Sequence, residues 1–591
     1  MRQIFLLALL AICLAVPALS NVRDVSNWTK TTRANSQHVV EFRVALRQRN
    51  LDILESTFLD ASNPKSVNYA KWWTIDQILD LVAPEEEKQL KVVNYLKSVG
   101  CFNVENRRDM IKASAEVEIV EKMFNVKMFN YVHNKKEQEI VRSGNDYSIP
   151  SEIKSLVHMV SGISELPHLK QGPKAQKIKL ATSKNVNAVK ADPGIVIPST
   201  IQSLYGIPTG YTNNPDSSLC LAEFSDDQSF NKKDLKTFAT DTATPVINVD
   251  HIVGPFSGSD PDLESTLDVQ YGGAVAETAS VWFWTVSGWM YDFVTDFVAT
   301  SPVPYVVSMS WGWPEPLQCQ SGIGNCKGET SEEYVDRVNV EFQKIGLMGV
   351  SLLAASGDQG APGDGNPNCN EDKKPISTIF PGASPWVTSV GATMLIESSA
   401  TQAVGDSAPI CSKKKCATST TEGVCTSPQA LITTGGGFSD YSPMPSYQQD
   451  VVEAYLKSGA VFPKNTYFNA SNRAFPDVSA LGHNYYIIAG GEGQVVDGTS
   501  CSSPVFGAIV TLLNSYRLNN NKPTLGFLNP LLYQLYAENQ SAYTDITTGN
   551  NYCTENCCSK VGYQATKGYD AVTGLGTPVF KEFLAYVQNL S

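Results

Sequence analysis

The feature that most constrains the fold is an alternation of two sequence patterns between residues 195 and 591. Short β-branched or apolar runs end in turns rich in Gly and Ser, and segments with helical spacing of apolar residues lie between them. The extended runs cover 218–224, 305–310, 350–355 and 386–390, and the helical segments cover 231–238, 262–276, 333–346 and 503–516. This alternation predicts an α/β fold in which a parallel sheet carries helices on both faces. We expect residues 195–591 to form one large domain of this kind.

The N-terminal part of the chain has a different sequence pattern. Within residues 21–165, apolar spacing predicts helices over 75–96, and a more alternating pattern predicts a partly extended segment over 116–132. The stretch 166–194 has few large side chains and contains Lys170, Lys174, Lys177, Lys179, Lys184 and Lys190. We interpret it as an exposed basic linker that proteases can reach; a plain flexible connector is the alternative.

The first 20 residues have the pattern of a secretory signal peptide. A positive end precedes an apolar run over 4–15 and a small-x-small exit near Ser20. The run is too short to span a bilayer, and the most apolar later stretch, 274–298, contains three acidic residues. We therefore expect a chain of the secretory pathway, lysosomal or secreted, with no membrane span after processing.

An oxidising compartment favours disulfides among the twelve cysteines that remain after Cys13 is removed with the signal. No pair of CxxC motifs with zinc spacing occurs, so a zinc site is disfavoured. Glycosylation is expected because the chain has Asn-x-Ser/Thr sequons at Asn27, Asn469, Asn539 and Asn589.

The composition narrows the function. The chain has 46 Lys and Arg against 59 Asp and Glu, a net charge of −13, whereas a nucleic-acid partner requires a basic face. Only six His are present, and after residue 195 only His251 and His483 remain. Neither is followed by Gly, as the His of a subtilisin-like site would be. A mechanism with a His base is therefore disfavoured.

A Gly-Thr-Ser turn at 498–500 precedes Pro504 and an apolar segment with helical spacing. This order places the Ser500 hydroxyl at a helix N-terminus, where backbone N–H groups and the helix dipole favour a developing oxyanion. We expect Pro504 in the first helical turn, where proline is tolerated. Taken alone, the turn is equally well explained as a simple helix cap.

Carboxylates can supply the base that a serine nucleophile needs. Glu264 and Asp268 are four residues apart and therefore project from one face of a helix. Two acids at such a short distance can share a proton, and they can accept one from a serine at acid pH. Asp358 follows an apolar run and should lie just past the carboxyl end of a strand, where ligand sites form in open α/β sheets. A solvated helix face and an ordinary turn are the alternatives.

Together these residues resemble the sedolisin family of serine-carboxyl peptidases, acid-active proteases with a subtilisin-like fold. The resemblance extends over nearly the full length, through Tyr69-Ala70-Lys71, 267–271, Ser356-Gly357-Asp358, 435–439, 475–478, Gly498-Thr499-Ser500 and 574–578. It implies a signal peptide at 1–20, an antiparallel α/β prodomain at 21–165, a cleavable linker at 166–194 and a peptidase domain at 195–591. The prodomain would be a partner of the enzyme until its removal in acid.

The resemblance also implies residue roles. Ser500 would be the nucleophile, Glu264 its general base, Asp268 a residue that orients the base, and Asp358 a donor to the oxyanion. The presence of all four argues against an inactive homologue that only binds peptides. A carbohydrate or lipid hydrolase is the other rival, and the chain has no Gly-x-Ser-x-Gly elbow. The expected activity on peptide and protein substrates is release of tripeptides from free N-termini, with an acid endopeptidase of the same family as the alternative.

The family's calcium site has matching segments near the C-terminus of this chain. The resemblance implies one structural ion held by the carboxylates of Asp545 and Asp570 and by the backbone carbonyls of Ile546, Thr566 and Gly568. Thr566 stands where a glycine is usual, but a carbonyl ligand does not depend on its side chain.

Overall fold

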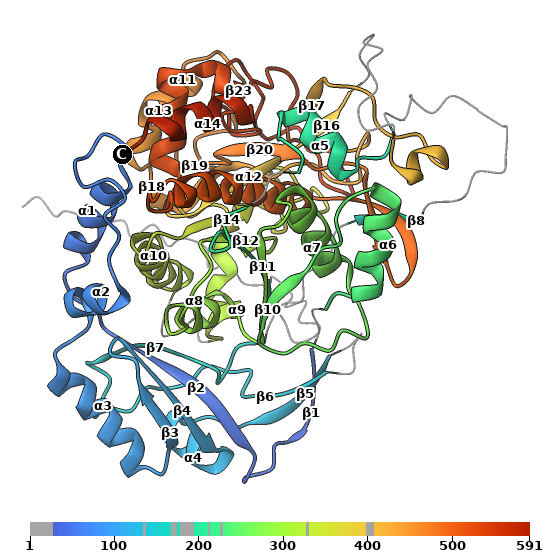
Figure 1. Ribbon diagram of the computed structural model, residues 1–591. Helices are drawn as coiled ribbons and strands as arrows, with labels where there is room; N and C mark the ends of the chain where they lie inside the picture. Colours follow the sequence, from blue (N-terminus) through green and yellow to red (C-terminus); the bar gives the residue numbers. More distant parts are fainter. Residues whose placement is uncertain are drawn as a thin grey trace, which may run out of the picture.

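The structure, a computed structural model, describes residues 28–133, 138–166, 174–177, 194–210, 213–224, 229–324, 326, 330–396 and 407–591. The predicted signal peptide and most of the predicted linker lie outside the described residues. The described chain forms a small N-terminal domain, drawn in blue at the bottom of Figure 1, and a large domain above it.

A mostly parallel sheet forms the centre of the large domain. In the described residues its strands follow the order β10 (Val249–Val253), β11 (Ser280–Val286), β9 (Ser218–Phe224), β12 (Val306–Met309), β14 (Ser351–Ala355), β16 (Thr388–Leu395) and β17 (Glu422–Val424). The strand β20 (Val478–Leu481) also pairs with β16, in parallel, whereas β17 pairs with β16 antiparallel. The predicted fold class, a subtilisin-like parallel sheet, is confirmed.

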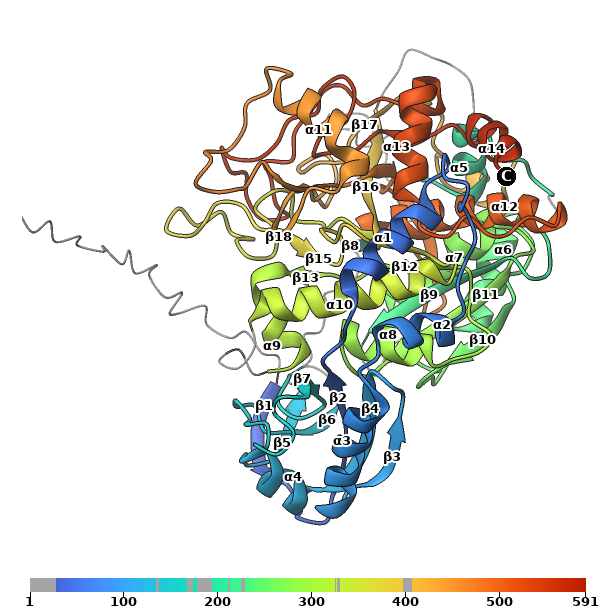
Figure 2. The ribbon, with the colours of Figure 1, turned by 90° about the vertical axis from the view of Figure 1, so that its left-hand side faces the viewer.

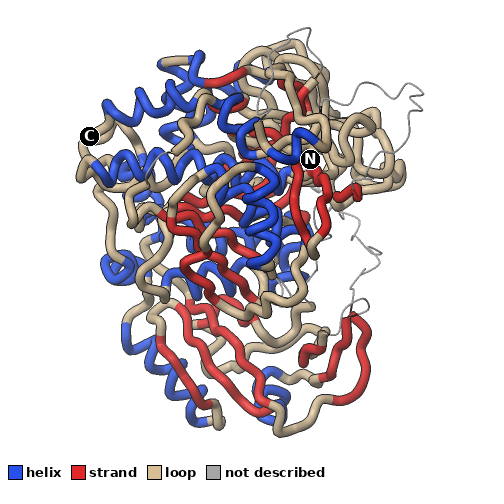
Figure 3. The backbone as a smooth tube through the Cα atoms, turned by 45° about the vertical axis from the view of Figure 1, so that its right-hand side comes forward, coloured by secondary structure: helices blue, strands red, loops and turns tan. Residues whose placement is uncertain are grey.

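Helices cover both faces of this sheet (Figure 3). One face packs against α5 (Pro198–Tyr205), α6 (Lys232–Thr242), α7 (Leu263–Val275) and α12 (Thr499–Asn519), and the other against α8 (Met290–Val298) and α10 (Ser331–Leu347). Alternate residues of β9 therefore enter different cores: Leu219 and Leu221 enter the first, and Cys220 and Ala222 the second. Because both faces are buried, the strand is apolar along nearly its whole length, which made it visible in the sequence.

Shorter elements surround the sheet. They are β13 (Trp313–Pro314), α9 (Gln318–Gly322), β15 (Ile379–Phe380), β18 (Gly437–Pro443), α11 (Gln449–Leu456), β19 (Asn472–Phe475), β21 (Tyr485–Ala489), β22 (Glu492–Asp497), α13 (Asn529–Glu538), β23 (Tyr543–Thr544), β24 (Thr577–Pro578) and α14 (Phe580–Asn589). The predicted disulfides are confirmed as Cys319–Cys326, Cys369–Cys557, Cys411–Cys416 and Cys553–Cys558. Four further cysteines are buried thiols: Cys101, Cys220, Cys425 and Cys501.

The N-terminal domain is antiparallel, as predicted. Its two sheets have the orders β3 (Phe102–Asn106), β4 (Met110–Glu116), β2 (Val39–Leu46), β7 (Val157–Ser161) and β1 (Trp28–Arg33), β5 (Phe129–His133), β6 (Glu139–Arg142). Its helices are α1 (Leu51–Ser62), α2 (Ile75–Val82), α3 (Glu86–Ser98) and α4 (Val117–Phe124). The extended prediction over 116–132 is wrong for α4, where Val117, Val120 and Phe124 share one buried helical face. The helices predicted over 75–96 are confirmed.

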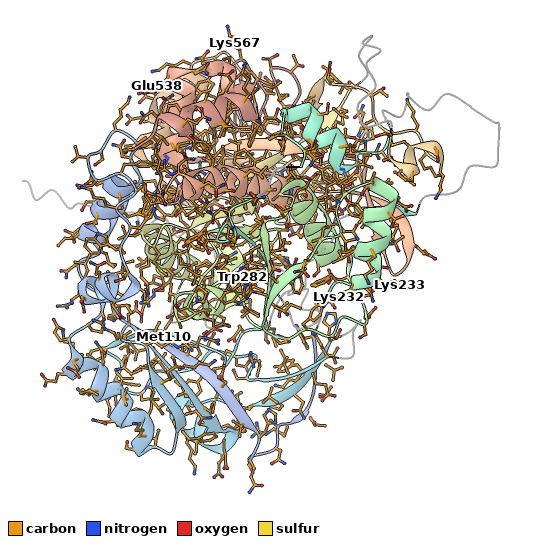
Figure 4. The ribbon with its side chains drawn as sticks, viewed as in Figure 1. Met110, Lys232, Lys233, Trp282, Glu538 and Lys567 are labelled. Carbon is orange, nitrogen blue, oxygen red and sulfur yellow. A yellow bond between two sulfur atoms is a disulfide. The ribbon has the colours of Figure 1, made fainter. Side chains whose placement is uncertain are left out.

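The two domains contact each other along two faces. At the lower face Met110, labelled in Figure 4, enters the same core as residues of α8 and α10. The second face is made by α1 and by the segment leading to α2, which cross the front of the large domain in Figure 2. In the part of the chain that the structure describes, no helix is both long and apolar enough to cross a membrane.

Candidate active site

Ser500 is the second residue of α12 and is fully buried. The helix begins at Thr499, earlier than predicted, so the expectation that Pro504 lies in the first turn is wrong: it is the sixth helical residue. A proline cannot donate to the carbonyl four residues before it. That carbonyl belongs to Ser500, and it lies 3.5 Å from the hydroxyl of Ser310, which donates to it.

Ser310 connects the candidate nucleophile to an acid on α7. It follows β12, and its Oγ lies 3.0 and 2.8 Å from the two carboxylate oxygens of Asp268. The Ser500 hydroxyl donates in turn to the carbonyl of Ser310 at 3.4 Å. Sequence reasoning missed Ser310, although its place at the carboxyl end of a central strand was a usable signal.

Glu264 and Asp268 lie one turn apart on α7, with 2% and 0% of their surface exposed. The helix packs directly against α12. A carboxylate removed from water must have a partner or a proton, so this pair is no solvated helix face.

A third buried acid, Glu223, adjoins this pair and was also missed. It lies near the end of β9, where its Oε2 accepts from the Trp311 indole N–H at 2.8 Å. Burial raises the pKa of Glu223 well above its usual value, and Asp268, Asp262 and Glu264 raise it further. The raised pKa favours the neutral form of Glu223 in acid, which lessens repulsion between carboxylates at the site. Its signal was an acid inside an otherwise apolar strand.

Asp358 reaches the same helix terminus from the other side. It lies in the loop after β14, and its Oδ1 accepts from the Thr499 backbone N–H and hydroxyl, both at 2.7 Å. A Cβ placed on Gly498 would lie 3.4 Å from the Ser500 Cβ and 3.6 Å from the second carboxyl oxygen of Asp358. The Asp358 Oδ2 atom and the Ser500 side chain therefore both lie next to Gly498.

The pKa of the Cys501 thiol reflects the charges around the start of α12. Burial raises its pKa well above the usual value, and the carboxylates of Asp497, Asp358 and Glu264 add to the rise. Acids from three elements thus approach the start of α12 together. The two histidines of the large domain have other contacts: His483 Nδ1 lies 2.8 Å from Asp497 Oδ2, and His251 stacks on Trp282.

A described piece of the predicted linker lies next to this site. The strand β8 (Lys174–Lys177) pairs antiparallel with β22, with Lys174 opposite Asp497 and Lys177 opposite Gln494. Since β22 leads directly through Gly498 to Ser500, the linker strand is paired with the strand that precedes the candidate nucleophile.

The predicted calcium residues lie around one loop. Asp545 accepts from the Gly568 N–H at 2.8 Å, and Asp570 accepts from the Thr566 N–H at 2.9 Å. Asp570 Oδ1 already accepts from three donors of Val572 and Thr573, whereas its Oδ2 accepts, within the described part of the chain, from Thr566 alone. Within the described residues, no group of three or more His, Cys, Asp or Glu side chains is placed to hold a metal.

Comparison with known proteins identifies the family. The chain is 55% identical over 569 residues to physarolisin of Physarum polycephalum, covering 96% of each chain. The chain belongs to the sedolisin family of serine-carboxyl peptidases. Within this family it is 30% identical to human tripeptidyl-peptidase 1, over 95% of this chain and 94% of the human one. Physarolisin is thus the more similar of these two relatives.

Residues 26–166 match the pro-kumamolisin activation domain. A sedolisin of Pseudomonas with bound pseudo-iodotyrostatin is similar over 66% of this chain and 97% of that one, at 24% identity and a TM-score of 0.49. This sedolisin-family chain is therefore a serine-type peptidase made as a zymogen with its own prodomain.

Proposed function

We propose that this sedolisin hydrolyses peptide bonds in acid through an acyl-enzyme on Ser500. The observation that carries the proposal is the hydrogen-bonded link from Ser500 through Ser310 to Asp268, at the start of α12. Glu264, one turn away on α7, would accept the Ser500 proton as the hydroxyl attacks the scissile carbonyl. Asp268 would orient that base.

Asp358 would donate a hydrogen bond to the oxyanion from the oxygen that faces Ser500. A carboxyl group can donate only when it is protonated. Activity should therefore fall as the pH rises far enough for Asp358 to lose that proton.

This role predicts the behaviour of Asp358→Asn, whose amide donates without titrating. We expect a lower maximal kcat/KM, by about a hundredfold, with the alkaline limit of activity moved to higher pH. The measurement is kcat/KM against pH. A profile with the wild-type alkaline limit and only a reduced height would show that Asp358 does not set that limit.

Two specificities remain within this proposal. Release of tripeptides from free N-termini is supported by the similarity to tripeptidyl-peptidase 1 over the full length. The alternative, an acid endopeptidase, is supported by the pairing of β8 with β22, because β8 is an internal segment paired with the strand that leads to Ser500. Digestion of a long peptide in acid distinguishes them: successive tripeptides from the N-terminus support the first, and internal fragments the second.

Ser500→Ala tests both the chemistry and the activation. The purified precursor should remain uncleaved in acid within the basic linker at 166–194, and it should cleave no added peptide. Ser502→Ala is a matched control, since its hydroxyl donates to backbone carbonyls of β20 instead. Conversion of the pure Ser500→Ala precursor would overturn autocatalysis, and peptide cleavage by it would overturn the acyl-enzyme.

We further propose one structural calcium ion, held by Asp545 and Asp570 with carbonyls of Ile546, Thr566 and Gly568. The fit is supported by the open lone pairs of Asp570 Oδ2 and, among the described residues, by the buried hydroxyl of Thr566, which has no hydrogen-bond partner there. Added calcium should raise the melting temperature in a concentration-dependent way, and a chelator should lower it. An unchanged melting temperature would remove the ion from the proposal.

The proposed setting is the secretory pathway, with the lysosome or the cell exterior as destination. It rests on the signal pattern at 1–20, on four disulfides and on the sequons. Asn469 and Asn539 are described and lie in loops beside Ser471 and Ser541. Peptides and proteins would be the substrates, with the segments 21–165 and 195–591 as prodomain and peptidase domain. Microscopy of the tagged chain and glycosidase treatment test the setting.

A further inference from the structure

A second pair of acids, which the proposed chemistry does not use, connects the segment after Ser310 to the strand β18. Glu315 is the first residue of the 3₁₀ turn η1 (Glu315–Leu317) and is fully buried. Its Oε1 accepts from the Ser439 hydroxyl at 2.9 Å, and its Oε2 accepts from the Asp440 backbone N–H at 2.7 Å. One buried carboxyl group therefore joins two segments of the peptidase domain.

The Thr378 hydroxyl lies between the two carboxyl groups. It is 2.7 Å from Glu315 Oε2 and 2.8 Å from Asp440 Oδ2, and both are hydrogen-bond distances. A hydroxyl has one proton to donate, so it donates to one of these oxygens, and the other oxygen must donate to it. One of the two carboxyl groups therefore carries a proton in this arrangement.

The surroundings favour Glu315 as the group that carries this proton. The Lys374 ammonium group lies 2.6 Å from Asp440 Oδ1, whereas no cation pairs with Glu315 in the described residues. The pKa of Glu315 is raised from 4.5 to about 7, chiefly by burial and then by the charge of Asp440, while its hydrogen-bond donors oppose the rise. In acid the pair therefore has one neutral and one charged member.

The other ionisable groups around the pair are neutral in acid or are acids themselves. Tyr441 and Tyr563 lie within electrostatic range of Asp440, and Glu332 of α10 lies within range of Tyr441. The helix α9, which also packs against η1, has no charged side chain. In the part of the chain that the structure describes, Lys374 is the one cation that pairs with either acid, and its side chain is 45% exposed.

Glu315 stands at the end of the segment that begins with Ser310. This segment contains β13, which pairs antiparallel with β15, and the Glu315 N–H extends the pairing by donating to the Thr378 carbonyl at 3.1 Å. A Cβ placed on Gly312 would lie 2.7 Å from the Ile379 side chain, so the segment lies directly against β15. The contacts of Glu315 therefore help to fix the position of Ser310.

Asp440 lies on the strand that continues from a support of the Asp358 loop. Before β18 begins, the Gly435 N–H donates to the Gly357 carbonyl at 2.7 Å, and the Thr433 N–H donates to the Asp358 carbonyl at 3.0 Å. The backbone at 433–435 thus runs beside the loop that carries the proposed oxyanion donor. The pair of acids connects this support to the segment of Ser310.

We propose that Glu315 and Asp440 are positioning residues that share one proton through Thr378 and so hold the Ser310 segment to the support of Asp358. We call this arrangement the proton lock. The inference rests on the proposed peptidase function and adds a pH-dependent control to it. When the shared proton leaves to solvent, two buried carboxylates face one hydroxyl and repel each other. The two segments then separate, and the site loses its geometry.

The sign of the pH dependence follows from Glu315. Its pKa in the folded chain is about 7, above the ordinary value of 4.5 that it has in the unfolded chain. The folded state therefore binds a proton that the unfolded state lacks between these two values. The lock stabilises the domain fully below pH 4.5, and this contribution is lost as the pH rises to about 7.

The first experiment measures how rising pH inactivates the activated enzyme. The wild type and Asp440→Asn are held at a series of pH values, returned to about pH 4 and assayed on one peptide, each relative to its own sample kept in acid. Because every assay is run at one pH, the protonation of Asp358 during turnover does not enter. The Asn amide donates to Thr378 without titrating, and Thr378 can then donate to an ionised Glu315. The pH of half inactivation should therefore rise by about one unit or more.

Two further variants sharpen this result. Asp450→Asn, the same change at an exposed acid of α11, is the matched control and should leave the pH of half inactivation as in the wild type. Lys374→Met keeps both acids but removes their cation, so the proton should be held to higher pH and the midpoint should rise by about half a unit. A midpoint that is unchanged or lowered in Asp440→Asn overturns the lock. If that variant yields no active enzyme, the same outcome in Lys374→Met overturns it.

A second measurement needs no activity and separates this inference from the proposed function. In full-length chains that carry Ser500→Ala, the melting temperature of Asp440→Asn relative to its parent should rise by about 3 °C between pH 4.5 and about 7. A difference that is constant with pH overturns the lock. Failure of the wild-type enzyme to cleave any peptide would overturn the proposed function, whereas the melting experiment would still decide the lock.

Discussion

The two faces through which the prodomain contacts the peptidase domain are built from different chemistry. On the lower face, buried charged groups of the two domains contact each other. Lys344 of α10 lies 2.6 Å from Asp109 of the prodomain, and Arg337 of α10 donates to the Leu46 carbonyl at 2.6 Å. Arg43 and Arg107 extend this face to α8. We call it the charged face.

The second face, formed by α1 and the segment before α2, is apolar. Phe58 stacks on Phe527 with ring centroids 4.9 Å apart and meets the edge of Trp386 at 5.7 Å. Trp72 fits against Gly349 and Gly526, where any Cβ would collide with the indole ring, and its N–H donates to the Thr524 carbonyl at 3.0 Å. We call this the apolar face.

The difference teaches that acid can act on one face alone. Protonation changes the charge of Asp109 or His158 on the charged face, whereas the stacked rings of the apolar face carry no charge to change. Acid can therefore loosen the prodomain at the charged face while the apolar face still holds it.

The largest effect is expected from Phe58→Ala on the apolar face. Loss of a fully buried ring should lower the free energy of unfolding by about 4 kcal/mol, and by the same amount at neutral and acid pH. Denaturant unfolding of the Ser500→Ala zymogen measures it without self-cleavage. Phe102→Ala, at a residue that is 41% exposed in the same domain, should cost under about 1 kcal/mol. A loss that varied with pH would contradict the distinction between the faces.

On the charged face, Lys344→Met should cost about 3 kcal/mol, because it removes one of the two cations that the buried acids Asp109 and Glu341 share and leaves them with Arg337 alone. Burial alone would raise the pKa of Asp109, but Lys344 and Arg337 hold it below its usual 3.8. This carboxylate therefore stabilises the zymogen above that pH and loses its contribution as the pH falls through its lowered pKa. Unfolding at several pH values tests the prediction: the cost should shrink in strong acid, and a cost independent of pH would contradict it.

The smallest effect, confined to one pH window, is expected from His158→Gln. The pKa of His158 on β7 is lowered from 6.5 to about 4, chiefly by burial and then by the positive charges of Arg337 and Arg47, while Glu333 opposes them. The unfolded chain thus binds a proton that the zymogen does not, and the zymogen loses stability as the pH falls from 6.5 to about 4, by about 2–3 kcal/mol. The variant should lack this slope. An identical slope in wild type and variant would exclude His158 as its source.

Much of the fold was predictable because its strongest signal is local. A strand buried on both faces is apolar throughout, so residues 218–224 were assigned correctly from sequence alone. The α4 helix was assigned wrongly because its buried residues, spaced by three and four, were too few to outweigh β-branched neighbours.

The residues of the candidate site also differ in whether the sequence alone could reveal them. Ser500 and the pair on α7 stand out by spacing within one element. Ser310 and Glu223 do not, because their significance arises only when β12 and β9 lie beside each other in the sheet. Arg43, which pairs with Asp292 and Asp296, lies 253 positions before Asp296, and no local sequence pattern predicts such a pair.

The central claim is that Ser500 carries the acyl group. The most direct test is intact mass spectrometry of the activated enzyme, quenched in acid during turnover of a peptide at about pH 4, near the usual pKa of carboxyl groups. We predict an added mass equal to the acyl portion of the peptide, located by fragmentation on Ser500. Undiminished cleavage by an enzyme that never gains this mass, or an acyl group on another residue, would contradict the account.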